Sequence, residues 1–295
     1  MNVCTESSMS AAVPLARPCP SQASAGADEL MRFGHALQNE GRLGEAAGCY
    51  ERITGLHPAF ADGWFEHGLA LQSLGDLPSA VHAFSAGLRL RPANADRLNA
   101  HGVMLQTVGR QQEARHAYGR SLARNPTNPE AYFNIGTVHD ALGSPAGALA
   151  AYRASLALDS PDEARVHNNI GGVLSAQGKY EASVSAYGEA VEADPDFADG
   201  WYNLGNLLLA MSRLGEAEVH LRRALRIVPK HERAASKLQH VRAEQLKARQ
   251  AEFEAEERIA ALNEAVDTCS DDSSCLQALT AEADARRDAD GPLIV

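Results

Sequence analysis

The chain has 295 residues and a formal net charge of −11, with 27 basic against 38 acidic side chains. No basic region is large enough to condense on phosphates, which argues against nucleic acid and anionic membranes as partners. No apolar run approaches the roughly 18 residues that a membrane-spanning helix needs, so we expect a chain without such a helix.

The first 26 residues are rich in Ser, Ala and Pro and contain no sustained apolar core. This composition is typical of a disordered segment and lacks the apolar stretch of a signal peptide. We therefore expect a disordered leader over residues 1–26, with a weak organelle-targeting peptide as the alternative.

Glycine and proline recur at a nearly constant period between residues 27 and 231. Successive glycines lie 34 or 35 residues apart, and so do successive prolines. The two series are Gly34, Gly68, Gly102, Gly136, Gly171 and Gly205, and Pro58, Pro92, Pro126, Pro161, Pro195 and Pro229. Repetition at this length predicts a stacked array of similar units, which favours binding over catalysis.

Each unit has the pattern of a helical hairpin. In the last unit Trp201, Leu204 and Leu208 are three and four residues apart, as on one face of an α-helix, and Ala217 and Leu221 repeat that spacing after a short turn. A second glycine stands where the first helix must stop and suits the left-handed backbone that ends helices. These glycines are Gly41, Gly75, Gly109, Gly143 and Gly178.

The motif W-x2-L-G-x2-L, followed by A-x3-[YFL] and a closing proline, closely resembles the tetratricopeptide repeat (TPR) family. Six consecutive units carry it, at 27–60, 61–94, 95–128, 129–163, 164–197 and 198–231. The resemblance implies an all-α fold, an α-solenoid that forms a right-handed superhelix, in which the first helices line a concave groove for a peptide. The fourth unit has one extra residue near Asp159 and Ser160, which we expect to lengthen a loop.

Residues 232–266 are polar, with scattered apolar side chains at Leu238, Val241, Ile259, Leu262 and Val266. Because the last unit of a solenoid needs a cover, we expect the first half of this segment to be a capping helix. Its charged second half is expected to project into solvent, where it is a candidate for tethering or for homodimerisation. Residues 267–295 are expected to form a flexible acidic tail.

Asparagine occupies the sixth position of the last three units, at Asn134, Asn169 and Asn203, with Asn168 and Asn206 close by. An amide side chain both donates and accepts hydrogen bonds, so a row of them can hold a peptide backbone of any sequence. A similar asparagine row is a feature of the repeat arm of O-linked N-acetylglucosamine transferases, which these units resemble. The alternative is that these residues only solvate or cap their helices.

Phe133 and Tyr202, at the fifth position of their units, complete the candidate peptide-binding set. Acidic side chains at the second position fit the helix dipole, and if they also face the groove they disfavour acidic ligands. The lysine, asparagine and arginine pattern with which some members of the family hold chaperone tails is not present in three adjacent units.

The sequence contains no convincing motif for a metal site, a phosphate-binding loop or a disulfide framework. The histidines lack metal-ligand spacing, and Gly178-Lys179 lacks the rest of a phosphate-binding loop. The five cysteines, an odd number at unrelated spacings, predict neither a disulfide framework nor a zinc site, which is typical of a reducing compartment. We therefore expect no catalytic residue, no cofactor and no metal.

The sequence predicts a cytoplasmic, non-enzymatic scaffold or adaptor that binds a peptide or partner protein in its groove. The alternative is the substrate-recognition arm of a protein glycosyltransferase, either truncated or acting beside a separate catalytic chain. Nothing after Val266 is long enough to form a nucleotide-sugar-binding domain.

Overall fold

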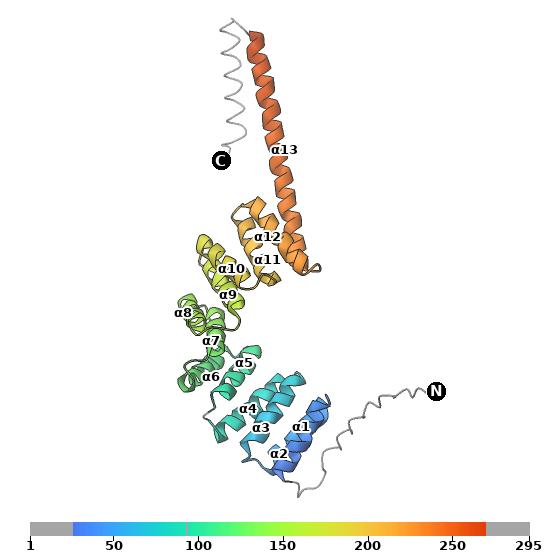
Figure 1. Cartoon of the computed structure of the whole chain (residues 1–295), viewed down its shortest axis with the longest axis vertical. Coiled ribbons are helices and arrows are strands. Elements are labelled where there is room, and N and C mark those ends of the chain that lie inside the picture. The colour runs from blue at the N-terminus through green and yellow to red at the C-terminus, as the bar shows by residue number, and fades with distance from the viewer. Residues whose placement is uncertain (1–25, 93, 270–295) are drawn as a thin grey trace, which may run out of the picture. The chain divides into compact units, whose positions relative to one another are not determined.

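The computed structural model describes residues 26–92 and 94–269, and these are helical with no strand. They form two compact units, divided between Ala193 and Asp194, with α1–α10 in the first and α11–α13 in the second. Figure 1 labels the helices along the chain. Their bounds are α1 Ala27–Asn39, α2 Leu43–Leu56, α3 Ala61–Ser73, α4 Leu77–Leu90, α5 Ala95–Thr107, α6 Gln111–Arg124, α7 Pro129–Ala141, α8 Pro145–Leu156, α9 Glu163–Ala176, α10 Tyr180–Ala193, α11 Ala198–Ala210, α12 Leu214–Ile227 and α13 Glu232–Cys269.

Twelve of these helices pair into hairpins, each with a turn of three residues. In five turns the middle residue is a glycine with a positive φ, for example +79° at Gly109. In the sixth turn Ser212 takes the same position with a φ of 60°. Glycine is favoured there because a side chain crowds the following carbonyl in the left-handed region.

The two helices of a hairpin approach closely at the repeated glycine. A Cβ atom at Gly102 of α5 would lie 2.5 Å from a ring carbon of Tyr118 in α6, and one at Gly136 would lie 2.6 Å from a ring carbon of Tyr152. Both tyrosine rings are buried. The sequence expectation that a small residue permits close packing is therefore confirmed.

Successive hairpins in the first unit stack through both of their helices. The second helix of one hairpin contacts the first helix of the next, and α5 and α9 both contact α7. Buried serines reinforce single hairpins: Ser121 of α6 donates to the carbonyl oxygen of Ala95, and Ser155 of α8 to that of Pro129, both at 2.8 Å. Each serine thus holds a second helix to the start of its own first helix.

The fourth hairpin is followed by a longer loop. Helix α8 ends at Leu156 and α9 begins at Glu163, which leaves six residues where the other hairpins are followed by four. Asp159 in this loop has a φ of 52°, and Ser160 is buried. The loop is therefore two residues longer than the others, because α8 has 12 residues where the other second helices have 14, and it lies where the extra residue of this unit was expected.

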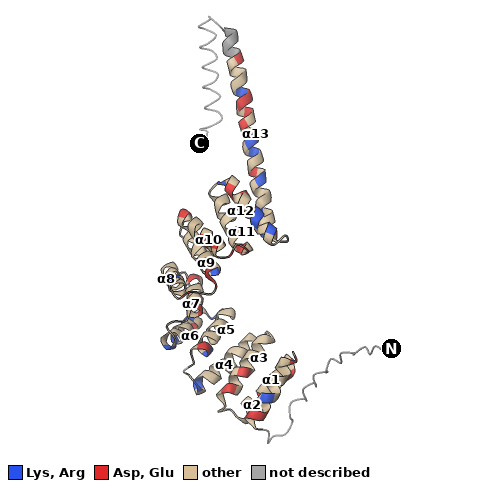
Figure 2. Ribbon diagram, viewed as in Figure 1, with Lys and Arg blue, Asp and Glu red and all other residues tan. Residues whose placement is uncertain are grey.

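The second unit contains the α11–α12 hairpin and the long helix α13. Ala234, Leu238 and Val241 of α13 are buried, and α13 contacts both α11 and α12. Beyond these turns α13 extends past the hairpin (Figure 1), and acidic and basic residues, red and blue on the ribbon of Figure 2, occur along its length. It runs to Cys269, so residues 267–269, expected in the tail, are helical instead.

Two further expectations concern the ends of the chain and the cysteines. The predicted leader up to residue 25 and the predicted tail from residue 270 lie outside the described residues. Cys49 is buried in α2 and is disulfide-bonded. The number and spacings of the cysteines argued against a framework of several disulfides and did not indicate this single one, because the spacing of cysteines in sequence says little about their approach in space.

Candidate functional site

The predicted peptide-binding residues all lie on first helices of hairpins. Phe133 and Asn134 lie on α7, Asn168 and Asn169 on α9, and Tyr202, Asn203 and Asn206 on α11. Helices α7 and α9 contact each other within the first unit, whereas α11 belongs to the second unit and is described with it.

Asn134 belongs to a chain of side-chain hydrogen bonds between α5 and α7. Its Nδ2 donates to Oδ1 of Asn99 at 3.3 Å, and Nδ2 of Asn99 donates to Oε1 of Glu130, also at 3.3 Å. Asn99 is only 7% exposed, while Asn134 is half-buried. One N–H of Asn134 therefore serves the fold, and its other N–H and its carbonyl oxygen lie on a partly exposed surface.

A second series of side-chain hydrogen bonds joins α6, α5 and α7. The hydroxyl of Tyr118 donates to Oε1 of Gln106 at 3.0 Å, and Nε2 of Gln106 donates to Oγ1 of Thr137 at 2.9 Å. Sequence reasoning did not predict this second series of hydrogen bonds. The available signal was a glutamine twelve residues before a tyrosine, which recurs at Gln38 and Tyr50 with the same 3.0 Å hydrogen bond.

On α9 the two neighbouring asparagines are linked to the preceding hairpin. Nδ2 of Asn169 lies 3.4 Å from the hydroxyl oxygen of Tyr152, and Nδ2 of Asn168 lies 3.5 Å from Oδ1 of Asn169. Burial raises the pKa of Tyr152 to about 12, so its hydroxyl stays protonated at neutral pH. Both asparagines remain half-buried and reach the surface of α9.

The aromatic residues of the predicted site are less exposed than the sequence suggested. The ring of Phe133 contacts that of Tyr152, with centroids 5.9 Å apart, and the guanidinium carbon of Arg165 lies 5.5 Å from the centroid of Phe133. Arg97 covers Phe65 of the second hairpin in the same way, at 4.0 Å. Such cation–π contacts fasten one hairpin to the next, and they were not foreseen from the sequence.

In the second unit Tyr202 is buried, and only Asn203 and Asn206 of the predicted set are partly exposed. The ring of Tyr202 packs against His231, with centroids 5.1 Å apart, and Arg233 lies 4.6 Å from its centroid. Tyr202 therefore joins α11 to the start of α13, which leaves little of its ring for a ligand.

Acidic side chains in the first turns of the first helices also contact neighbouring residues, and Asp62 of α3 is an example. Oδ1 of Asp62 lies 2.7 Å from a guanidinium nitrogen of Arg97, and its Oδ2 lies 3.0 Å from one of Arg91. Partial burial of Asp62 opposes ionisation, but the two guanidinium groups outweigh it and hold the pKa of the carboxyl below its usual value. Asp62 thus helps to join the second hairpin to the third, in addition to the expected effect on the helix dipole.

Among the side chains that the structure describes, no three of His, Cys, Asp and Glu gather closely enough to hold a metal ion. None of the described helices is both long and apolar enough to cross a membrane. The arrangement on the first helices consists of amides, hydroxyls and covered aromatic rings, which suits hydrogen bonding to a ligand.

Comparison with solved structures shows the fold. PilW, described as a widely conserved type IV pilus biogenesis factor, has 18% identity and a TM-score of 0.62 over 72% of this chain and 98% of PilW. YrrB, described as a TPR protein with an unusual peptide-binding site, has 21% identity and a TM-score of 0.51 over 65% of this chain and 98% of YrrB. The Cut9–Hcn1 structure from APC/C has 18% identity and a TM-score of 0.57 over 73% of this chain, which spans only 42% of that protein.

Sequence comparison gives the family directly. Models of the tetratricopeptide repeat match residues 31–95, 100–163 and 198–231, and a further TPR model matches residues 173–212. No curated protein matches the sequence significantly. The matched residues cover most of the hairpins from α1 to α12, with their three-residue turns and close glycine contacts. The chain therefore belongs to the tetratricopeptide repeat family.

Proposed function

We propose that this protein is an interaction adaptor without enzymatic activity of its own, which binds an extended peptide along the first helices of its hairpins. Membership of the TPR family supports a protein-interaction scaffold. The specific proposal concerns helices α7 and α9, where the sequence places asparagines at equivalent positions.

The observation that carries the proposal is the state of Asn134 and Asn169. Each side chain donates one amide N–H to a neighbouring side chain, Asn134 to Asn99 and Asn169 to Tyr152, and its second N–H lies on a partly exposed surface. The internal hydrogen bonds fix the orientation of the amides, so little rotamer freedom is left to lose when a ligand binds. A peptide backbone offers the alternating carbonyl and N–H groups that such amides recognise.

The spacing of the helices supports an extended ligand. Packed helices lie ~8–10 Å apart, and three residues of an extended chain at ~3.3 Å each cover the same distance. Neighbouring hairpins would therefore meet equivalent backbone groups of the ligand. The carboxylate of Glu130 near the start of α7 disfavours acidic peptides on this surface.

The test compares three forms of the full chain in a pull-down from native lysate, read by mass spectrometry. The double variant Asn134→Ala, Asn169→Ala is expected to lose a defined set of partners. The control Gln112→Ala removes an amide from the exposed surface of α6 and is expected to keep that set. A partner set identical in all three forms would refute the proposal.

Folding must be measured in parallel, because Asn134 donates to the buried Asn99. The loss of this hydrogen bond is expected to cost about 1 kcal/mol, too little to unfold the hairpins. Thermal unfolding followed by circular dichroism separates a loss of binding from a loss of structure. A separate Asn203→Ala, Asn206→Ala variant tests whether the second unit contributes.

The asparagine row also suits the recognition arm of a protein glycosyltransferase that acts through a separate catalytic chain. This second candidate predicts that the purified protein recovers transferase activity from cell extract supplied with a labelled sugar nucleotide. A pull-down that recovers partners but no such activity would leave only the adaptor.

Helix α13 is proposed to tether the protein or to form a homodimer. Its outer part carries exposed apolar side chains, among them Leu246 at 58%, Phe253 at 60% and Ile259 at 58% exposure. The mass of the full chain in solution, measured by light scattering, is expected to fall from dimer to monomer in a Phe253→Asp, Ile259→Asp variant. A wild-type chain that is monomeric at high concentration would leave only the tether.

A further inference from the structure

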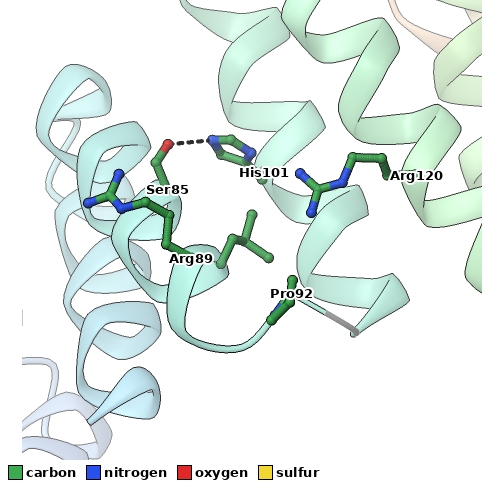
Figure 3. A pocket seen from close by; sticks show the side chains of 6 residues that line it. Ser85, Arg89, Pro92, His101 and Arg120 are labelled. Atoms are coloured by element: carbon green, nitrogen blue, oxygen red, sulfur yellow. Dashed lines mark hydrogen bonds between the residues drawn. The ribbon is translucent and has the colours of Figure 1, made fainter. Parts of the chain in front are cut away.

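A pocket lies away from the asparagine row, among helices α4, α5 and α6 (Figure 3). It is lined by Ser85, Leu88 and Arg89 of α4, Pro92 of the following loop, His101 of α5 and Arg120 of α6. Its volume is about 390 Å³, within the range of small-molecule sites. The repeat fold does not need these polar groups here, because most equivalent positions in other hairpins carry other residues.

The polar centre of the pocket is a hydrogen bond between Ser85 and His101. Oγ of Ser85 lies 3.0 Å from Nε2 of His101, and the ring of Phe84 lies nearly parallel to the imidazole. Burial, reinforced by the positive charges of Arg110 and Arg120, lowers the pKa of His101 to about 4. The imidazole is therefore neutral at pH 7, and its surroundings disfavour added positive charge.

The charge around the pocket comes from arginines. Within the described part of the chain neither Arg89 nor Arg120 forms an ion pair, whereas Arg110 is held by Glu113 at 2.7 Å. Helix α4 contains no acidic residue, and α6 contains three arginines against that one glutamate. The chain as a whole has a net charge of −11, so this positive surface is local, and Figure 2 colours basic positions on α6 blue.

The two pocket arginines differ in direction. In Figure 3 Arg120 extends from α6 toward the pocket, while the guanidinium of Arg89 turns outward from α4. Arg89 is exposed, and exposed side chains change rotamer within nanoseconds. Arg89 can therefore swing toward an anion held by Arg120.

We propose that this pocket binds the phosphate group of a phosphate monoester, with Arg120 and Arg89 as charged donors. The hydroxyl of Ser85 is the neutral donor, in the tautomer in which Nε2–H of His101 donates to Oγ of Ser85. A guanidinium presents paired N–H groups that match two phosphate oxygens, and two such groups balance the dianion. A carboxylate has one charge and two oxygens, so it would leave one arginine unmatched. The ligand is either a small phosphate compound or a phosphorylated side chain, since both present the same group.

The test is a titration of the full chain with inorganic phosphate, a short phosphoserine peptide and acetate, at constant ionic strength. Binding is followed by the amide NMR signals of α4, α5 and α6. We expect saturable binding of phosphate and weaker binding of acetate. Arg120→Ala and Arg89→Ala are each expected to weaken phosphate binding by about tenfold or more, as for the loss of a charge-assisted hydrogen bond.

The matched control is Arg124→Ala, which removes the same charge from an exposed position on α6, outside the pocket lining. It is expected to change the affinity less than about threefold, because screened charges at a distance contribute little. Equal weakening by Arg124→Ala and Arg120→Ala would overturn the proposal, and so would phosphate binding that does not saturate or does not exceed that of acetate.

Comparing the affinities for inorganic phosphate and for the phosphoserine peptide distinguishes the two possible sources of the ligand. A phosphoserine peptide that binds much more tightly than both inorganic phosphate and its unphosphorylated form would identify a phosphorylated side chain. Equal affinity for inorganic phosphate and the phosphopeptide would identify small phosphate compounds as the ligand class.

Discussion

Replacing Gly102 by alanine tests whether the repeated glycine is present for close packing. The added Cβ would lie 2.5, 2.7 and 2.8 Å from three ring atoms of Tyr118, which is fully buried. The ring is not able to swing aside cheaply, because its hydroxyl is hydrogen-bonded to Gln106 at 3.0 Å. Helices α5 and α6 must therefore separate, and overpacking of this kind typically costs ~1–3 kcal/mol.

Gly119→Ala is the matched control, because it makes the same substitution inside α6, where a Cβ would meet nothing within 4 Å. It is expected to raise the free energy of unfolding by ~0.5–1 kcal/mol, since alanine has the higher helix propensity. The two variants should therefore change stability in opposite directions.

The assay is urea unfolding of the full chain followed by helical circular dichroism, with amide hydrogen exchange of α5 and α6. The exchange measurement is needed because the hairpins of a solenoid can unfold separately. A Gly102→Ala chain as stable as the Gly119→Ala chain, with unchanged exchange in α5 and α6, would refute the packing argument.

Three further outcomes are expected. Ser121→Ala removes the 2.8 Å hydrogen bond to Ala95 from a fully buried site, so urea unfolding should show a loss of about 1 kcal/mol or more, and an unchanged midpoint would contradict this. At the turns, thermal unfolding should show Gly109→Ala destabilised by ~1–2 kcal/mol and Ser212→Gly stabilised, because both positions have a positive φ; the same sign for both would be inconsistent with backbone strain. The pKa of His101 falls from 6.5 to about 4 on folding, so the unfolded chain binds the proton more strongly and the free energy of unfolding should decline as the pH falls from 6.5 to 4. In the His101→Gln variant this free energy, measured by urea unfolding at several pH values, should decline less. The same dependence on pH in both chains would contradict the lowered pKa of His101.

The architecture could be predicted because its information is local and repeated. The spacing of three and four between apolar residues specifies each helix, and a glycine such as Gly109 specifies the turn. These signals recur along the chain, so an error in one unit is corrected by the others. Even the place of the longer loop, near Asp159, followed from counting one extra residue.

The candidate site could be predicted only in part. Position within the repeat placed Asn134 and Asn169 correctly on first helices, yet it gave no indication that each amide is bound to a neighbour. It also suggested an available ring at Tyr202, which the structure buries against His231 and Arg233. A partner some thirty residues away is invisible to a periodic pattern, because the pattern describes what the units share.

The sequence by itself thus determined the helices, the turns and the order of the hairpins, since these depend on short spacings that recur in every unit of about 34 residues. Only the tertiary structure decided which polar groups meet between hairpins. Arg97 over Phe65, and the grouping of Arg89, His101 and Arg120 around one pocket, depend on how hairpins rotate and stack. That geometry arises from side chains that differ between units, and it appears only when all of them are packed together.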